Sequence, residues 1–144
     1  MTQLLGTWDG DAELVSVLLG TAAVAALVGD RVHPDYAPED TMAGPWCRYR
    51  LNEEPSEAVP LGGEPTLQQL VYLVEFLVPE ELGLEPVRPA VLAAVAALDG
   101  HSATGENGVK LSYYRLGEVR LQPAQDQRGQ LWLRSGLRVG LDAY

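Results

Sequence analysis

Hydrophobic positions near the N-terminus follow the three- and four-residue spacing of one helical face. The residues that form this apolar stripe are Leu14, Val15, Leu18 and Leu19. Asp9 or Asp11 stands where a helix N-cap is expected. Thr21 is placed to cap a second, short helix through Val28, and Gly29 is the residue type that most readily ends a helix in a left-handed conformation. The pattern therefore predicts two stacked helical segments rather than one long helix.

After these helices the hydrophobic period changes to two. A brief strand is expected at Arg31-Val32-His33. A half-buried strand follows from Pro45, in which alternate residues share a side: Cys47, Tyr49 and Leu51 on one, Arg48 and Arg50 on the other. The segment Asn52–Pro65 contains three prolines, two adjacent glycines and four glutamates, which is typical of an exposed loop or an extended hairpin arm. Thr66–Val78 is nearly continuously apolar and rich in β-branched residues, which predicts a central strand covered on both faces.

The second half of the chain begins with a helix that starts at Pro86 or Pro89 and closes at Gly100. Its large apolar residues have helical spacing: Val91, Leu92, Val95 and Leu98. A polar loop, Asp99–Gly108, follows. Alternation over 109–121 then predicts a strand, and a slip in the pattern near Arg115–Gly117 predicts a bulge.

A turn at Asp126–Gly129 leads into the last strand. In that strand Leu131, Leu133, Leu137, Val139 and Leu141 face one side, and Trp132, Arg134 and Arg138 face the other. The order of elements is helices, strands, helix, strands. It predicts one α+β domain over 1–144, a mostly antiparallel sheet of four to five strands with two to three helices packed on it.

The length, charge and cysteine content of the chain limit the kinds of protein and partner that it can represent. The chain has 144 residues, 47% of them hydrophobic, which is enough to bury the core of a single domain. A formal charge of −10 disfavours binding to nucleic acid or to an anionic membrane, since both attract clustered Lys and Arg. The single cysteine, Cys47, fits a reducing compartment. The apolar run Leu14–Val28 is too short to cross a bilayer, so a soluble, cytoplasmic protein is expected.

Local motifs do not predict catalysis. His33-Pro34-Asp35 matches the tripeptide of J-domain cochaperones, but there it lies between two helices, whereas here it follows a strand. Gly100 and Gly105 have the glycine spacing of a phosphate-binding loop, yet Glu106 occupies the lysine position and would repel a phosphate. We interpret the first motif as a strand end closed by proline and the second as a loop.

Metal ligands and nucleophiles are equally sparse. Cys47 is expected to face the core, and His33 and His101 lack the spacing of a metal site. The glutamates of the 52–65 segment lack the glycine-punctuated alternation of a calcium loop. We therefore predict that the protein is not an enzyme, with no catalytic or metal-binding residues and no cofactor.

Outward-facing aromatic and arginine side chains suggest an interface between subunits. On the 109–121 strand the residues expected to face outward are Lys110, Tyr114, Glu118 and Arg120. The candidate interface residues are Arg48, Arg50, Glu53, Glu54, Glu57, Glu64, Trp132, Arg134 and Arg138. The arginines need acidic partners, and the glutamates of a neighbouring copy are one source. The alternative is that Trp132 and Tyr114 are covered by helices of the same chain.

Three segments resemble the tail terminators, which are small tail-completion proteins of long-tailed bacteriophages and prophages. The resemblance is carried by Ala22–Pro34, by the start of the strand at Pro45-Trp46 and by the closing hairpin Val119–Leu141. The family often has Tyr-Pro where this chain has His33-Pro34, and the arm Asn52–Pro65 looks variable within the family.

This resemblance implies a structural virion protein. Six copies typically form a ring that ends tail growth at the head-proximal end of the tail tube and joins it to the head connector or stopper protein. The resemblance also implies assembly in the host cytoplasm and contact with the tail tube protein, while DNA passes through the lumen without specific binding. Acidic residues that face the lumen would repel DNA over the Debye length of about 8–10 Å. We expect the arm 52–65 and the loop 99–108 to reach neighbouring subunits.

Two other hypotheses belong to different classes. A small α+β ligand-binding or regulatory domain that acts as a dimer would need a concave apolar pocket with convergent polar groups. A hydrolase that uses His33 or His101 lacks a nucleophile. The oligomeric mass separates the ring from the dimer.

Overall fold

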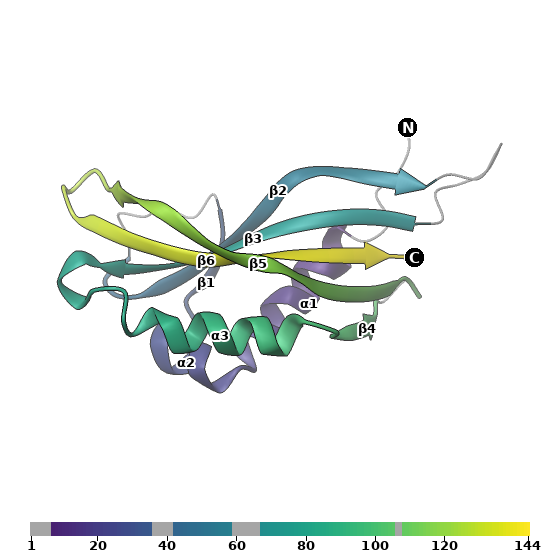
Figure 1. Cartoon of the computed structure of the whole chain (residues 1–144), viewed down its shortest axis with the longest axis horizontal. Coiled ribbons are helices and arrows are strands. Elements are labelled where there is room, and N and C mark those ends of the chain that lie inside the picture. Colours follow the sequence, from purple (N-terminus) through teal and green to yellow (C-terminus); the bar gives the residue numbers. More distant parts are fainter. Residues whose placement is uncertain (1–6, 36–41, 59–66, 106–107) are drawn as a thin grey trace.

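The computed structural model describes residues 7–35, 42–58, 67–105 and 108–144 (Figure 1). Glu64 and the rest of 59–66 lie outside these residues, and the side chains of 53–58 are also undescribed. The helices and strands are α1 (Thr7–Leu19), α2 (Ala22–Val28), β1 (Val32–Pro34), β2 (Trp46–Ala58), β3 (Leu67–Pro79), the 3-10 turn η2 (Glu80–Leu82), α3 (Val87–Leu98), β4 (Ser102–Thr104), β5 (Lys110–Gln125) and β6 (Leu131–Ala143).

The strands form one sheet in the order β1-β2-β3-β6-β5-β4. β1 is parallel to β2, and every other neighbouring pair is antiparallel. The predicted α+β class with a mostly antiparallel sheet is therefore confirmed. The sheet has six strands because β4 lies inside the segment 99–108, which the sequence predicted as a loop; β4 pairs with Lys110–Ser112 at the start of β5. Three residues with polar neighbours carry too little hydrophobic pattern to predict such a strand.

The break between the two N-terminal helices is confirmed, as are the positions of Thr21 and Gly29 at the two ends of α2, but the predicted cap of α1 is not. α1 begins at Thr7, before Asp9 and Asp11, so neither aspartate caps it. Thr21 is the N-cap residue of α2 and has an extended conformation, but its side chain makes no capping hydrogen bond; its hydroxyl donates to the Val17 carbonyl, 2.7 Å away. Gly29 ends α2 with a φ of 62°, as expected for glycine at this position. Among the described residues no single helix is long and apolar enough to span a membrane; Asp9–Leu19 and Ala22–Val28 satisfy the criteria only as a pair bent by 85°.

All three helices pack on one face of the sheet, where they build the main core (Figure 1). α3 turns one side toward the sheet: Val87, Ala90, Val91, Ala94 and Leu98 are buried. Leu92 was predicted on that side but is 47% exposed. The small residues Ala90 and Ala94 are the ones that allow α3 to approach the sheet closely.

The opposite face of the sheet carries no described helix, yet part of it is buried. A second apolar cluster lies there, formed by Met42, Trp46, Leu77 and Trp132. β3 is consequently covered on both faces from Tyr72 to Pro79, which confirms the central strand predicted for this segment. We call this side of the sheet the helix-free face.

The sheet is much longer than the helices that cover it. At about 3.3 Å per residue, the 16 residues of β5 extend over about 50 Å. At 1.5 Å per residue, the 12 residues of α3 cover only about 18 Å. The two ends of the sheet therefore extend beyond the helices: the β2–β3 arm at one end and the β5–β6 hairpin at the other (Figure 1).

The predicted bulge in β5 is confirmed and changes which residues share a face. The register with β6 shifts between Arg115 and Gly117, where Gly117 has a φ of 138°. Before the shift Tyr114 is paired with Gly140 on the helix-free face; after it Glu118 is paired with the core residue Leu137. Glu118 and Arg120 are exposed as predicted. They lie on the helix side, however, and do not share a face with Tyr114.

Candidate functional site

The helix-free face centres on a buried carboxylate. Glu75 lies in the middle of β3, and its side chain is only 1% exposed. Arg48 on β2 donates to the Glu75 carboxylate, and Arg134 on β6 lies 3.5 Å from its other oxygen. Arg50 lies 3.8 Å from the same oxygen as Arg134. We call Arg48, Arg50, Glu75 and Arg134 the arginine–glutamate cluster.

The sheet register explains why these side chains meet. Arg48 is paired with Glu75 across β2 and β3, and Glu75 is paired with Gly136 across β3 and β6. Arg134 is one step along the same face from Gly136 and therefore lies diagonally next to Glu75. Arg50 is also diagonal to Glu75 and adds one contact of 3.9 Å with Asp35, which follows β1. Arg48 and Arg50, which the sequence predicted on one side of this strand, therefore form ion pairs with carboxylates of their own chain.

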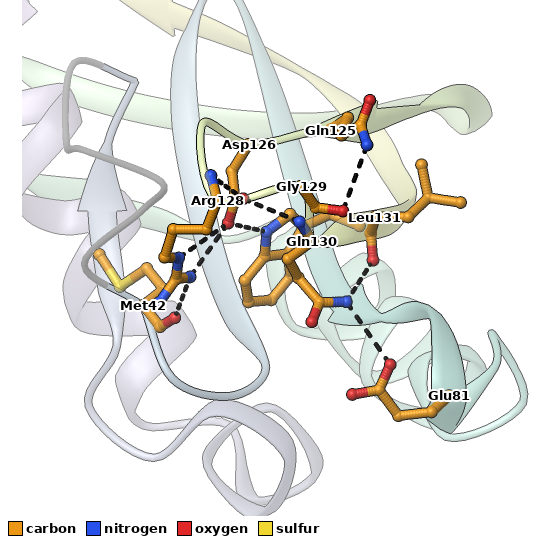
Figure 2. Close-up of polar contacts among 9 residues, drawn as sticks. Met42, Glu81, Gln125, Asp126, Arg128, Gly129, Gln130 and Leu131 are labelled. Carbon is orange, nitrogen blue, oxygen red and sulfur yellow. Dashed lines mark hydrogen bonds and ion pairs between the residues drawn. The ribbon is translucent and has the colours of Figure 1, made fainter.

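Trp132 is part of a second polar arrangement at the β5–β6 hairpin, drawn in Figure 2. The Asp126 carboxylate accepts hydrogen bonds from the Trp132 indole, from the Arg128 side chain and from the backbone N–H groups of Arg128 and Gln130. Arg128 also donates to the Met42 carbonyl, 2.9 Å away, on the segment before β2. These bonds fix the predicted turn and tie it to the second apolar cluster.

Asp126 has an unusual pKa because of these contacts. Burial raises the pKa, but the hydrogen bonds from Trp132, Arg128 and Gln130 outweigh it and lower the pKa to about 2. The carboxylate is therefore ionised near neutral pH. Its role is structural, since its hydrogen bonds join the turn to the start of β6.

A third polar group lies under α1 on the helix side of the sheet. The Tyr72 hydroxyl donates to Asp11 at 2.5 Å, and the Tyr113 hydroxyl donates to the Gly10 carbonyl at 2.6 Å. Burial raises the pKa of Asp11, while the hydrogen bond from Tyr72 lowers it; the net shift is upward. His101 lies 2.7 Å from Glu13 and connects the segment after α3 to α1.

The remaining sequence candidates do not form a reactive site in the described part of the chain. Cys47 is fully buried, and burial together with the charge of Glu75 raises the pKa of its thiol, so the thiolate is disfavoured. His33 and His101 belong to different elements, β1 and the α3–β4 connection. Among the described residues no group of three or more His, Cys, Asp and Glu side chains could hold a metal ion.

The predicted interface residues divide into three sets. Trp132 is 1% exposed and Arg48 is 8% exposed, so the expectation that they present an outward surface is wrong: Trp132 is covered by Met42 and Trp46, and Arg48 is held by Glu75. Arg50, Arg134 and Arg138 remain partly or largely accessible. Glu53, Glu54 and Glu57 lie on β2, but their side chains, like all of Glu64, are outside the description.

The sequence analysis missed Glu75 and Asp126, which organise both polar arrangements. Glu75 interrupts the apolar run of β3 and faces the alternating arginines of β2, so it was the available signal. A groove of about 540 Å³ was also not predicted. It lies beside the second half of β5, where its lining includes Arg88, Leu92 and Arg120.

Comparison with known proteins identifies a fold but no family. No family model matches the chain, and no curated protein matches it. A solved structure superposes with a TM-score of 0.61 at 15% sequence identity, over 96% of this chain and 96% of that one. The name of that protein describes no activity or partner. At this identity the likeness shows the fold alone.

Proposed function

We propose that the protein is a structural virion component that forms a ring at the head-proximal end of a phage tail tube. The ring ends tail growth and joins the tail to the head connector or stopper protein. The observation that carries the proposal is the mismatch between sheet and helices: both ends of the sheet extend beyond the helices that cover its middle (Figure 1). Such extensions provide contact surface for other subunits, and the resemblance of Ala22–Pro34 and Val119–Leu141 to tail terminators supplies the identity of the assembly.

The polar arrangements are consistent with a joint between subunits. In the arginine–glutamate cluster, ion pairs connect neighbouring strands of the sheet. The hydrogen bonds of Asp126 fix the conformation of the β5–β6 hairpin. A subunit that sets the position of a neighbour needs this kind of rigid surface. In the proposed ring, DNA passes through the lumen without specific binding, in keeping with the formal charge of −10 per copy.

Imaging of the purified protein tests this function directly. Negative-stain images should show rings, and mixing with purified tail tubes should place one ring at one end of each tube. A tail-tube preparation without the protein is the control, and its tubes should have no ring. Tubes that remain uncapped at a molar excess of protein would contradict the proposal. A stable dimer that binds a small molecule would instead support the alternative of a ligand-binding domain.

A further inference from the structure

The second half of β5 presents a free sheet edge. β4 pairs only with Lys110–Ser112, and the Asp99 side chain accepts the last contact on this side from the Arg115 backbone N–H, at 3.0 Å. From Leu116 to Gln125 no described strand pairs with the outer edge of β5. The N–H and C=O groups of such an edge are available to another strand.

β2 has a matching free edge at the other end of the sheet. β1 pairs with Cys47–Tyr49, and the Asp35 N–H donates to the Tyr49 carbonyl at 3.0 Å. From Arg50 to Ala58, β2 has only β3 as a partner among the described strands. This part of β2 is one strand of the arm.

The two free edges cannot pair within one molecule, because they lie on opposite margins and at opposite ends of the sheet (Figure 1). The two edges can, however, pair between two copies of the protein. β2 and β6 are both antiparallel to β3, and β5 is antiparallel to β6. If a second copy keeps the orientation of the first, its β2 therefore lies antiparallel to the first copy's β5. The contact uses two different surfaces, and a heterologous contact of this type generates a ring when its rotation closes.

Proline positions limit how far these edges can pair. Pro123 in β5 and Pro55 in β2 have no N–H to donate, and each lies at or near a register shift. The windows without proline are consequently Leu116–Gln122 and Arg50–Glu54; the register shift between Leu51 and Glu53 lies inside the second. Prolines and bulges in an edge strand also discourage uncontrolled addition of further strands.

Charge favours the same pairing. The arm 52–65 contains four glutamates and neither Lys nor Arg. Beside the β5 window, Arg120 and Arg88 line the 540 Å³ groove together with Glu85 and Glu118, and Arg115 lies just before the window. The receiving edge thus offers exposed arginines, beside two glutamates, to an incoming strand whose charged residues after Arg50 are all glutamates.

We propose that the β2–β3 arm of a second copy adds to the free half of β5 as an antiparallel strand, so that the sheet continues from one subunit into the next. This inference rests on the ring proposed above and names the contact that builds it. An antiparallel register that fits the two windows places Arg50 opposite the region of Leu121.

Engineered disulfides test the contact, because Cys47 is buried and does not compete. The variant Arg50→Cys is combined with Leu121→Cys or Val119→Cys, which lie on the helix-free face like Arg50. Matched controls combine Arg50→Cys with Arg120→Cys or Glu118→Cys, which face the helix side. Under oxidation the face-matched pairs should shift from monomer to a ladder of covalent oligomers on a non-reducing gel, and the controls should remain monomeric. A mixture of the two single-cysteine variants should stop at the dimer.

Separate results identify which proposal fails. If the wild-type protein caps tail tubes but neither face-matched pair cross-links, or if the controls cross-link equally well, the strand contact is wrong and the function stands. If the face-matched pairs form the ladder but no ring is found on tail tubes, the contact stands and the proposed function is wrong. Thermal unfolding of each reduced variant verifies that it is folded.

Discussion

Glu75 illustrates how a single residue holds one face of this protein together. Its carboxylate is buried among the guanidinium groups of Arg48, Arg50 and Arg134. Breaking a buried ion pair by removing one partner leaves the other charge buried without compensation, which is far more costly than losing an exposed pair.

Replacing Glu75 with glutamine should therefore destabilise the fold. We expect the free energy of unfolding to fall by about 3 kcal/mol, the usual effect of breaking a buried pair. Urea denaturation followed by tryptophan fluorescence measures it. The matched control is Asp35→Asn, which removes a half-exposed partner of the same arginines and should cost less than about 1 kcal/mol. Equal losses in the two variants would show that Glu75 is not the centre of the cluster.

The hydrogen-bonded carboxylate of Asp126 should make the stability of the fold depend on pH in the acid range. Its pKa is lowered from 3.8 to about 2 in the folded protein, so its contribution is fully present above pH 3.8 and is lost as the pH falls toward 2. Asp126→Asn should lower the unfolding temperature at pH 7, and the difference from wild type should shrink between pH 4 and pH 2. Thermal unfolding across this range provides the measurement. A difference that stays constant with pH would mean that the charge of Asp126 is unimportant.

Ionisation of Asp11 should have the opposite effect on stability from ionisation of Asp126. Its folded-state pKa is raised from 3.8, so ionisation above that pH costs stability in the folded protein. Asp11→Asn keeps an oxygen acceptor for Tyr72 and removes this cost, and it should be at least as stable as wild type at pH 7. The advantage should vanish below pH 3.8. Tyr72→Phe serves as the comparison, because it removes the hydrogen bond and should lower stability; a clear loss for Asp11→Asn at pH 7 would contradict the argument.

On the scale of single elements, the packing of β6 requires glycine at two positions, Gly136 and Gly140. Gly136 is paired with Glu75, and a Cβ added there would overlap the backbone carbonyl of Val74. Gly140 is paired with Tyr114, and the atoms nearest to a Cβ added there belong to the Tyr114 side chain. The backbone of a central strand cannot move away, whereas a partly exposed ring can.

Alanine substitutions should separate these two glycines. Gly136→Ala should reduce the free energy of unfolding by about 2 kcal/mol or more, as overpacking in a core does. Gly140→Ala should have a smaller effect, because the Tyr114 ring can rotate away. Chemical denaturation of both variants under identical conditions tests the order. A larger loss for Gly140→Ala would mean that the Tyr114 ring is held more firmly than the backbone of β3.

The elements that the sequence predicts well are those with a long hydrophobic period. β3, α3 and the hairpin of β5 and β6 have such periods, and even the bulge at Arg115–Gly117 appears as a slip in the alternation. The sequence does not predict β4, because a three-residue edge strand has almost no pattern. The sequence predicts Arg48 and Trp132 on an exposed face. The alternation of residues distinguishes the two faces of a strand, but it does not show whether other residues cover a face. Here the cover comes from the second apolar cluster, in which Trp46 lies on the same face of the sheet and Met42 belongs to the segment before β2.

On the scale of the whole molecule, charge is distributed unevenly between the sheet and its arm. The arginine–glutamate cluster lies near the middle of the sheet, while β2 carries Glu53, Glu54 and Glu57 toward its far end. Ala58 is eight positions after Arg50, a distance of about 26 Å along an extended strand. The pairing of β2 with β3 therefore holds the far end of β2 away from Arg50.

Removal of the arm should consequently abolish assembly while the rest of the fold survives. Deleting Glu53–Glu64 removes none of the described residues that form the main core. We expect a folded monomer in circular dichroism and analytical ultracentrifugation that neither forms rings nor joins heads to tails. A full-length variant with Glu53, Glu54, Glu57 and Glu64 changed to Gln separates charge from backbone pairing: assembly should survive, with weaker dependence on salt, because strand addition relies on main-chain hydrogen bonds. Ring formation by the deletion variant would exclude the arm from the subunit contact.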